Sequence, residues 1–468
     1  MPAQAGIVSG VAAPSILWAL TSSMTSEAHT KGDPFGYVYG LARGREEKGW
    51  WHSFELPDGT VIDGVNTLPS LNERLSCFPI PGDLRGKRVL DIGTWDGWFA
   101  FEMERRGATV VAIDDWDNPR FREVHARLGS QVDYRIMDFY DLTPGSVGRF
   151  DIVLFMGVLY HLKHPLLALE RVCALSTDSV ALSSFILQER HGLEPGAERR
   201  ALMEFYETDE FGGQTDNWLA PTLSCLPALC RTAGFARVEL QATSEFGASI
   251  MCYRRWLPSG KTGSAAKLLY AVHNRNWGRN FLSERDEAVT LIFEAEEKDL
   301  DRLSVYPEAG GFGVIPLSAG RLAPGVWQIN CKLPPGLPSG WRDVTVATRN
   351  CTRGEPVPIA IDMPIEPLPG TRLLAASDGT TWIPGRVELT KGNILCVWAA
   401  DLPDNADVAN VRVELGDVVL RPLYVGSRAQ SSWQINVQLP AGTATGNASV
   451  RFRLGTWWSN SVSVDVSG

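Results

Sequence analysis

A ten-residue segment, Arg88–Gly97, constrains the fold of this chain more than any other feature. It reads Arg-Val-Leu-Asp-Ile-Gly-Thr-Trp-Asp-Gly, so an apolar run typical of a buried strand leads into a turn that contains Gly93 and Gly97. The apolar positions within 99–103 predict the buried face of a helix after the turn. Glycine at a strand-to-helix turn lets a nucleotide approach the backbone closely. The segment therefore predicts a nucleotide site in an α/β domain.

Further apolar runs predict parallel strands at the spacing of strand–helix–strand units: Val110–Asp114, Gln131–Asp138, Phe150–Met156, 181–187 and 236–240. Asp114, at the end of the second run, lies 23 positions after Asp91. A carboxylate at that place reaches ribose hydroxyls, so we expect Asp114 to bind a ribose, with Asp115 as its rival for this role. The third run also ends in an acid, Asp138.

These runs predict an α/β Rossmann-like domain over residues 46–296, preceded by an N-terminal extension, 1–45. Within the domain, the polar stretch 188–214 is too long for a plain connection, and we expect a lid or a substrate loop there. Ala288–Phe293 is either the seventh strand of the same sheet or the first strand of the next module.

The C-terminal part of the chain has a different sequence pattern. The segment 257–285 is expected to hold one helix, and after it the sequence predicts short strands separated by frequent Gly/Pro turns. The sequence Trp-Gln-Ile-Asn occurs at Trp327 and again at Trp433, 106 positions later. A repeat at this period predicts two tandem Ig-like β-sandwich modules, 297–380 and 381–468, with both tryptophans in the cores.

The amino-acid composition limits which classes of function and which cellular locations are expected for this protein. The formal net charge is −10, whereas a protein dedicated to nucleic acid usually carries a basic footprint. The eight cysteines are scattered without a Cys-x-x-Cys pair, so we expect no metal site and a reducing, cytoplasmic location. The mildly apolar stretch Ile7–Leu20 is too short to span a bilayer, and no Lys or Arg precedes Lys31 as in a signal peptide. We therefore expect no membrane partner.

The order of these motifs resembles the class I S-adenosylmethionine (SAM) methyltransferases, whose first motif is usually Asp-x-Gly-x-Gly-x-Gly. Here Trp95 takes the place of the middle glycine. A dinucleotide site is a weaker interpretation, because it requires Gly-x-Gly-x-x-Gly. The resemblance implies SAM as the cofactor, without a metal. It also implies a cofactor site built from Asp91, Gly93, Thr94, Gly97, Asp114, Asp115, Asp138, Phe139 and Met156.

A narrower resemblance, from about Trp50 to Val238, is to the tRNA wobble-uridine carboxymethyltransferases. It rests on Met-Gly-Val-Leu-Tyr-His at Met156–His161, followed by His-Pro-Leu. Those enzymes use carboxy-SAM and hold its extra carboxylate with a lysine and an arginine. The corresponding places here fall near Trp51 and Glu287, which cannot pair with a carboxylate. We therefore expect ordinary SAM as the donor.

Tyr160 and His161 follow the fourth predicted strand, where open α/β sheets bind their ligands. His161 is either a general base, since its unperturbed pKa lies near 6.5, or a residue that orients Tyr160. Tyr160 is expected to position the substrate or the reactive methyl group. In the resembling family, substrate-side residues occupy the places of Asp216, Asn217 and Trp218.

The sequence therefore predicts a SAM-dependent methyltransferase that acts on an oxygen or nitrogen of a small-molecule or sugar acceptor. One alternative is a tRNA wobble-uridine (carboxy)methyltransferase, which the acidic composition does not favour. The other is a non-catalytic scaffold protein with a SAM-binding fold. The oligomeric state stays open, with a homo-oligomer among the alternatives.

Overall fold

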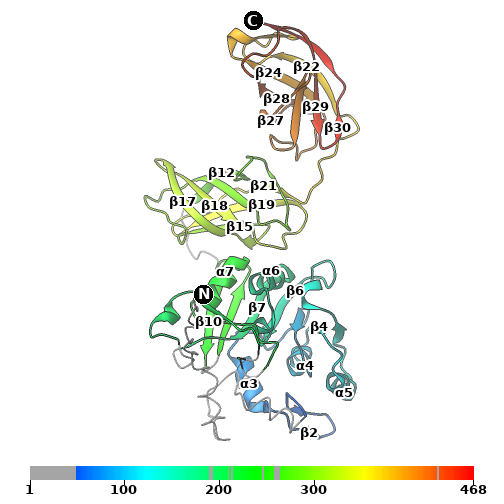
Figure 1. The fold of residues 1–468 in the computed structure, drawn as a ribbon, viewed down its shortest axis with the longest axis vertical. Helices are drawn as coiled ribbons and strands as arrows, with labels where there is room; N and C mark the ends of the chain where they lie inside the picture. The colour runs from blue at the N-terminus through cyan, green and yellow to red at the C-terminus, as the bar shows by residue number, and fades with distance from the viewer. Residues whose placement is uncertain are drawn as a thin grey trace, which may run out of the picture. The chain divides into compact units, whose positions relative to one another are not determined.

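The computed structural model describes residues 49–188, 193–208, 210–211, 214–244, 247–257, 264–429 and 432–468. The predicted extension, 1–45, lies outside these residues. The chain divides into two compact units, Met1–Trp256 and Leu257–Gly468 (Figure 1). Among the described helices, none is long and apolar enough to cross a membrane.

The first unit is built on a seven-stranded sheet in the order β10-β11-β7-β6-β3-β4-β5. The central strands are parallel, and β11 runs antiparallel to both of its neighbours. The strands are β3 (Arg88–Ile92), β4 (Thr109–Asp114), β5 (Asp133–Ile136), β6 (Phe150–Met156), β7 (Ser176–Phe185), β10 (Arg237–Thr243) and β11 (Gly247–Tyr253). The predicted α/β class is confirmed, and its seventh strand is β11 rather than Ala288–Phe293.

Helices cover both faces of this sheet, which explains why its strands are nearly continuous apolar runs. One core contains Leu90 and Ile92 and the inner sides of α6 (Pro165–Leu175) and α7 (Cys225–Ala233). The other contains Val89 and the inner sides of α3 (Leu68–Ser76), α4 (Trp98–Arg105) and α5 (Pro119–Leu128). Residues alternate between the two cores along β3, as the period of a strand requires.

Short elements surround the carboxyl ends of the parallel strands. A hairpin of β1 (Phe54–Glu55) and β2 (Val61–Ile62) precedes α3, and a second joins β8 (Met203–Phe205) to β9 (Leu219–Pro221). The described part of this unit also contains the 3₁₀ turns η1 (Phe139–Asp141), η2 (Leu159–His161) and η4 (Ala197–Arg199).

The second unit contains two β-sandwiches. The first packs the sheet β17-β18-β14-β12-β20 against β13-β21-β19-β15-β16 around one apolar core. Its strands are β12 (Ala265–His273), β13 (Asn280–Phe281), β14 (Ala288–Glu294), β15 (Val305–Ala309), β16 (Phe312–Gly313), β17 (Ile315–Ala323), β18 (Val326–Lys332), β19 (Gly340–Thr348), β20 (Thr352–Arg353) and β21 (Val357–Ile361).

The second sandwich packs β22-β24-β28-β27 against β23-β31-β29-β25-β26, with β30 beside β29. Its elements are β22 (Arg372–Asp378), β23 (Arg386–Glu388), η5 (Leu389–Lys391), β24 (Ile394–Ala400), β25 (Val411–Leu415), β26 (Val418–Leu420), β27 (Pro422–Ala429), β28 (Ser432–Gln438), β29 (Gly446–Leu454), β30 (Trp457–Trp458) and β31 (Val462–Ser467). The repeated tryptophans, Trp327 and Trp433, are buried on the equivalent strands β18 and β28.

Three sequence expectations are corrected by these sheets. The boundary between the two modules lies before Arg372 and not at 380, because β22 pairs with β24 of the second sandwich. Ala288–Glu294 forms β14, which pairs with β12 and β18, so the second unit starts at Leu257 and not at 297. The helix expected within 257–285 is instead the strand β12, on which Ala266, Leu268 and Ala271 are buried. Pairing with β14 outweighs the helix propensity of its alanines and leucines.

Candidate functional site

The turn between β3 and α4 requires its two glycines for different reasons. Gly93 and Gly97 have φ angles of 69° and 96°, in the left-handed region. A Cβ on Gly93 would lie 2.5 Å from Val158, and one on Gly97 would lie 2.6 Å from both Phe101 and Phe121. Gly93 lines the cavity described below, whereas Gly97 does not and instead lets α4 pack closely. The structure thus places Gly97 behind the predicted cofactor site rather than in it.

Trp95 occupies the third position of this turn with a φ of 55°, a conformation that costs a residue with a Cβ about 1–2 kcal/mol. Its backbone N–H donates a 2.8 Å hydrogen bond to Oδ2 of Asp114 at the end of β4. The N–H of Asp115 donates to Oδ1 of the same carboxylate at 3.0 Å. The turn conformation therefore fixes the orientation of the Asp114 carboxylate.

Asp91 and Asp114 are both buried, and both have raised pKa values. Burial raises the pKa of Asp91 to about 7, although the Thr94 hydroxyl donates to its Oδ2 at 2.7 Å. Burial also raises the pKa of Asp114 to about 6, against the two backbone hydrogen bonds that it accepts. Burial therefore disfavours the charged forms of both carboxyl groups.

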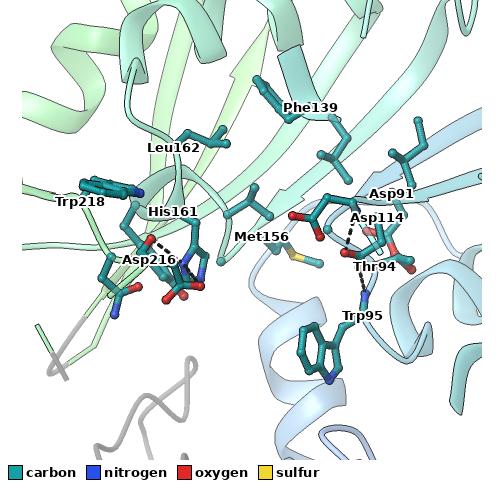
Figure 2. Close-up of a pocket in the computed structure, with 18 of the residues that line it drawn as sticks. Asp91, Thr94, Trp95, Asp114, Phe139, Met156, His161, Leu162, Asp216 and Trp218 are labelled. Atoms are coloured by element: carbon teal, nitrogen blue, oxygen red, sulfur yellow. Dashed lines mark hydrogen bonds and ion pairs between the residues drawn. The ribbon is translucent and has the colours of Figure 1, made fainter. Parts of the chain in front are cut away.

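A cavity of about 700 Å³ opens over the carboxyl ends of the parallel strands. Its volume lies within the range of small-molecule and cofactor sites. Figure 2 shows Asp91, Thr94 and Asp114 on one side, His161 and Trp218 on the other, and Met156 between them. The predicted site residues that line it are Asp91, Gly93, Thr94, Asp114, Asp115, Asp138, Phe139, Met156, Tyr160 and His161.

The far side of the cavity is built by η2 and the segment before β9. The N–H of Trp218 donates to the carbonyl of Tyr160 at 2.7 Å, and Nδ1 of His161 lies 3.2 Å from the carbonyl oxygen of Asp216. Burial lowers the pKa of His161, with the Asp216 carboxylate at 3.4 Å acting in the opposite direction. The ammonium of Lys163 lies 4.3 Å from the centre of the Trp218 ring.

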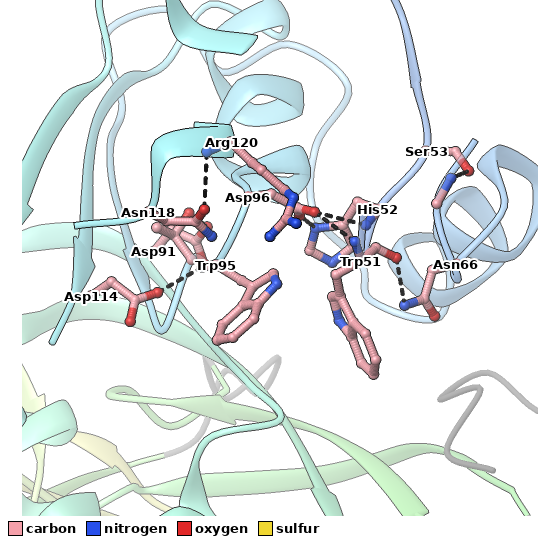
Figure 3. Close-up of polar contacts among 12 residues, drawn as sticks. Trp51, His52, Ser53, Asn66, Asp91, Trp95, Asp96, Asp114, Asn118 and Arg120 are labelled. Carbon is pink, nitrogen blue, oxygen red and sulfur yellow. Dashed lines mark hydrogen bonds and ion pairs between the residues drawn. The ribbon is translucent and has the colours of Figure 1, made fainter. Parts of the chain in front are cut away.

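A third wall comes from the segment before β1. The Asp96 carboxylate accepts the backbone N–H groups of Trp51 and His52 at 2.9 and 3.0 Å, and it contacts Nδ1 of His52. Asp96 lies in the β3–α4 turn, so this contact joins the N-terminal segment to the first motif. In Figure 3 the indoles of Trp51 and Trp95 project from this junction toward the same side. Both line the cavity.

Sequence reasoning missed His52, Asp96 and Arg74 as residues of the site. Arg74 is buried on the inner side of α3, beside Leu71 and Leu75, and lines the cavity. The sequence did contain one indication for Arg74, because an arginine on the apolar side of an amphipathic helix is unusual. Of the two places aligned with carboxylate-binding cations, Trp51 lines the cavity. Glu287 belongs to the second unit, where it accepts the N–H of Leu282.

Comparisons with known proteins agree with this geometry. Residues 68–223 match the family model of a methyltransferase domain. The chain is 28% identical over 160 residues to the tRNA U34 carboxymethyltransferase of Pseudomonas fluorescens, which covers 34% of this chain and 48% of the relative. It is 40% identical over 128 residues to the ubiquinone biosynthesis O-methyltransferase of Xanthomonas oryzae pv. oryzae, covering 27% and 50%. The chain therefore spans about half the length of the curated relatives it matches.

Among solved structures, the N-terminal domain of EvdMO1 in the presence of SAH and D-fucose is similar at 23% identity. It covers 46% of this chain and 94% of that chain, with a TM-score of 0.34. The family match runs from α3 to β9 and includes most of the residues that line the cavity, although not Trp51 and His52. The first unit thus contains a segment, residues 68–223, that is similar to methyltransferase domains, and all-β modules follow it along the chain.

Proposed function

We propose that the cavity binds SAM and that the protein transfers the methyl group to an oxygen or nitrogen of a small-molecule or sugar acceptor. The observation that supports this most is the arrangement of the cavity wall. All of the residues expected to bind the cofactor except Gly97 line the cavity, and so do Tyr160 and His161. In Figure 2, Asp91 and Asp114 lie on one side and His161 on the other, with Met156 between them.

Methyl transfer from a sulfonium is an in-line displacement, so the enzyme must hold the donor and the acceptor atom at near-attack distance. Asp114 would accept the ribose hydroxyls, and Asp138 with Phe139 would contact the adenine. Positioning within an enclosed cavity can contribute several kcal/mol to the rate without a metal.

The acceptor side combines an aromatic surface with polar groups. Trp218 offers an indole face, while Gln214, Asp216 and Asn217 line the same wall. Oδ1 of Asn217 is buried and, among the described residues, receives no hydrogen bond. This chemistry suits a sugar or a phenolic metabolite.

A tRNA acceptor is the second candidate, and it is favoured by the likeness to the tRNA U34 carboxymethyltransferases. The net charge of −10 disfavours a tRNA acceptor, because contacts between basic side chains and phosphates dominate the affinity of nucleic-acid complexes. A non-catalytic scaffold is the third candidate, and it predicts SAM binding without turnover.

The test is to measure the release of S-adenosylhomocysteine from SAM by the full chain, in separate reactions with sugars, phenolic metabolites, nucleosides and tRNA. Turnover with a sugar or phenol supports the proposal, and turnover with tRNA alone supports the second candidate. SAM binding without turnover on any of these acceptors would favour the scaffold.

A further inference from the structure

The outer face of the second β-sandwich carries a row of basic side chains that the proposed function does not use. Arg412 on β25 pairs directly with Arg453 on β29, and Arg453 pairs in turn with Trp458 on β30. Arg421 directly follows β26, whose register with β25 brings it next to Arg412. Residues opposite each other on antiparallel strands share one face of the sheet. We call Arg421, Arg412, Arg453 and Trp458 the basic row.

The basic row lies on the solvent side of this sheet. The residues that flank its arginines on β25 and β29 are buried in the core of the sandwich: Val411, Val413, Phe452 and Leu454. Because side chains alternate between the two faces of a strand, Arg412 and Arg453 point away from this core. Arg421 is exposed, and the other members of the basic row are half-buried. A ligand in solution can therefore reach the row.

The positive charges of the basic row are not neutralised by the described part of the chain. Within the described residues, Arg412, Arg421 and Arg453 form no ion pair with a carboxylate. Nη1 of Arg412 donates to the carbonyl oxygen of Val411 at 2.6 Å, which is a neutral acceptor. Burial lowers the pKa of Arg412, and Arg421 and Arg453 lower it further, whereas Asp407 acts in the opposite direction. Like charges opposite each other destabilise a sheet, so a bound anion would stabilise this one.

A second pair of charged side chains on the same face is neutral overall. Glu414, two positions after Arg412, accepts hydrogen bonds from Nη2 of Arg451 at 2.8 and 3.0 Å. The guanidinium of Arg451 lies 4.2 Å from the centre of the Trp458 ring, and that of Arg453 lies 5.4 Å from it. These contacts between cations and the ring keep the indole beside the unpaired guanidinium of Arg453.

The first sandwich shows that the fold itself does not require the basic row. At the 106-residue period of the repeat, Arg412 and Arg453 correspond to Tyr306 and Ala347. Tyr306 and Ala347 form the equivalent cross-strand pair, between β15 and β19. The same strands can therefore pair without opposed arginines. This difference between the two copies is expected if the arginines of the second sandwich bind a ligand.

We propose that the basic row binds a phosphorylated sugar. Arg412 and Arg453 bind the phosphate, because guanidinium groups donate paired hydrogen bonds to phosphate oxygens. Trp458 contacts the sugar ring, which has an apolar face of C–H groups. The row crosses three strand spacings of about 4.8 Å each, enough for one phosphate and its sugar. A single-stranded nucleic acid requires a longer basic groove with several aromatic residues.

The test is titration calorimetry of the full chain with glucose 6-phosphate, inorganic phosphate and glucose. Glucose 6-phosphate should bind more tightly than phosphate, and glucose should not bind. Arg412→Gln and Arg453→Gln should each weaken the binding of glucose 6-phosphate by about 10- to 100-fold, the scale of a hydrogen bond to a charged group. Arg372→Gln, which removes an exposed arginine on β22 of the opposite sheet, is the matched control and should change the affinity less than twofold.

Two further measurements separate the roles of the side chains. Trp458→Ala should weaken the binding of glucose 6-phosphate by about three- to tenfold, the scale of an aromatic contact, and leave that of inorganic phosphate within twofold. Without ligand, Arg412→Gln and Arg453→Gln should melt at or above the temperature of the wild type, because each removes a repulsion between like charges. Lower melting temperatures in both variants would assign the arginines a structural role and overturn the proposal.

Three other results would also overturn it. One is the absence of saturable binding of both glucose 6-phosphate and phosphate by the wild type. Another is an unchanged affinity in Arg412→Gln and Arg453→Gln. The third is tighter binding of a single-stranded RNA oligomer that increases with its length and is lost in the same variants, which would assign the basic row to nucleic acid. None of these measurements depends on the proposed function of the first unit.

Discussion

The backbone N–H of Trp95 donates a 2.8 Å hydrogen bond to Oδ2 of Asp114 and so connects the first motif to the end of the second strand. This contact explains how the chain tolerates tryptophan where related methyltransferases have glycine. The turn needs a left-handed residue whose amide points at Asp114, and Trp95 supplies that amide at the cost of backbone strain. The indole of Trp95 lines the cavity and packs against Trp116, with 5.6 Å between ring centres.

The raised pKa values of Asp91 and Asp114 predict an unusual dependence of stability on pH. Both carboxyls bind a proton in the folded state at a higher pH than in the unfolded chain, so protonation favours folding. The free energy of unfolding of the ligand-free protein should therefore rise as the pH falls from about 8 to about 6. Urea titrations at several pH values measure it. Asp91→Asn can still accept a hydrogen bond from Thr94, and it should make the free energy of unfolding depend less on pH. An unchanged pH dependence in this variant would contradict the raised pKa of Asp91.

His161 is predicted to act as a general base in its neutral form. Because burial lowers its pKa below 6.5, turnover should rise with pH in the acidic range and level off by neutral pH. His161→Ala should reduce turnover by about 10²–10⁴-fold and abolish this titration. A smaller loss with the pH profile retained would mean that His161 orients Tyr160. The measurement needs the acceptor found by the release screen.

Tyr160→Phe provides the companion test on the same 3₁₀ turn. Tyr160 is buried against His161 and Phe211, so the change should preserve the fold and SAM affinity. Turnover should fall, because only a hydroxyl near the reacting centre is lost. Full activity in both variants would place the chemistry elsewhere, most directly with the groups of the 214–218 segment.

Ordinary SAM is predicted to bind at least as tightly as carboxy-SAM. Trp51 lines the cavity where the resembling family has a cation. A competition titration between the two donors decides the question. Carboxy-SAM binding tenfold tighter, a difference of about 1.4 kcal/mol, would show that another group accepts the extra carboxylate.

The β-sandwiches are predicted to be dispensable for cofactor binding. Each has its own apolar core and complete strand set, and the first unit ends at Trp256. A fragment that ends at Trp256 should bind S-adenosylhomocysteine with the affinity of the full chain. If this fragment is folded by circular dichroism but does not bind, the modules are parts of the catalytic unit.

The sequence predicted those parts of the site that lie at the carboxyl ends of the parallel strands. Asp91, Gly93 and Asp114 follow from local spacing, because parallel strands place their carboxyl ends at one edge. Arg74 had one local indication, its place on the apolar side of α3. His52 and Asp96 meet through a contact between segments distant in the chain, which no local pattern encodes. The strand β12 was missed for the same reason, since its pairing with β14 overrides the propensity of its residues.

The binding of SAM by the wild-type chain and by Asp114→Ala, measured by calorimetry, tests the central claim most directly. The wild type should bind SAM and S-adenosylhomocysteine at one site. Asp114→Ala should lose about 1.5–3 kcal/mol of binding free energy, the scale of hydrogen bonds to a charged group. Asp138→Asn, at the neighbouring strand end, is the companion variant and should lose less, because an amide oxygen can still accept a hydrogen bond. The absence of binding by the wild type, or an unchanged affinity in Asp114→Ala, would contradict the account.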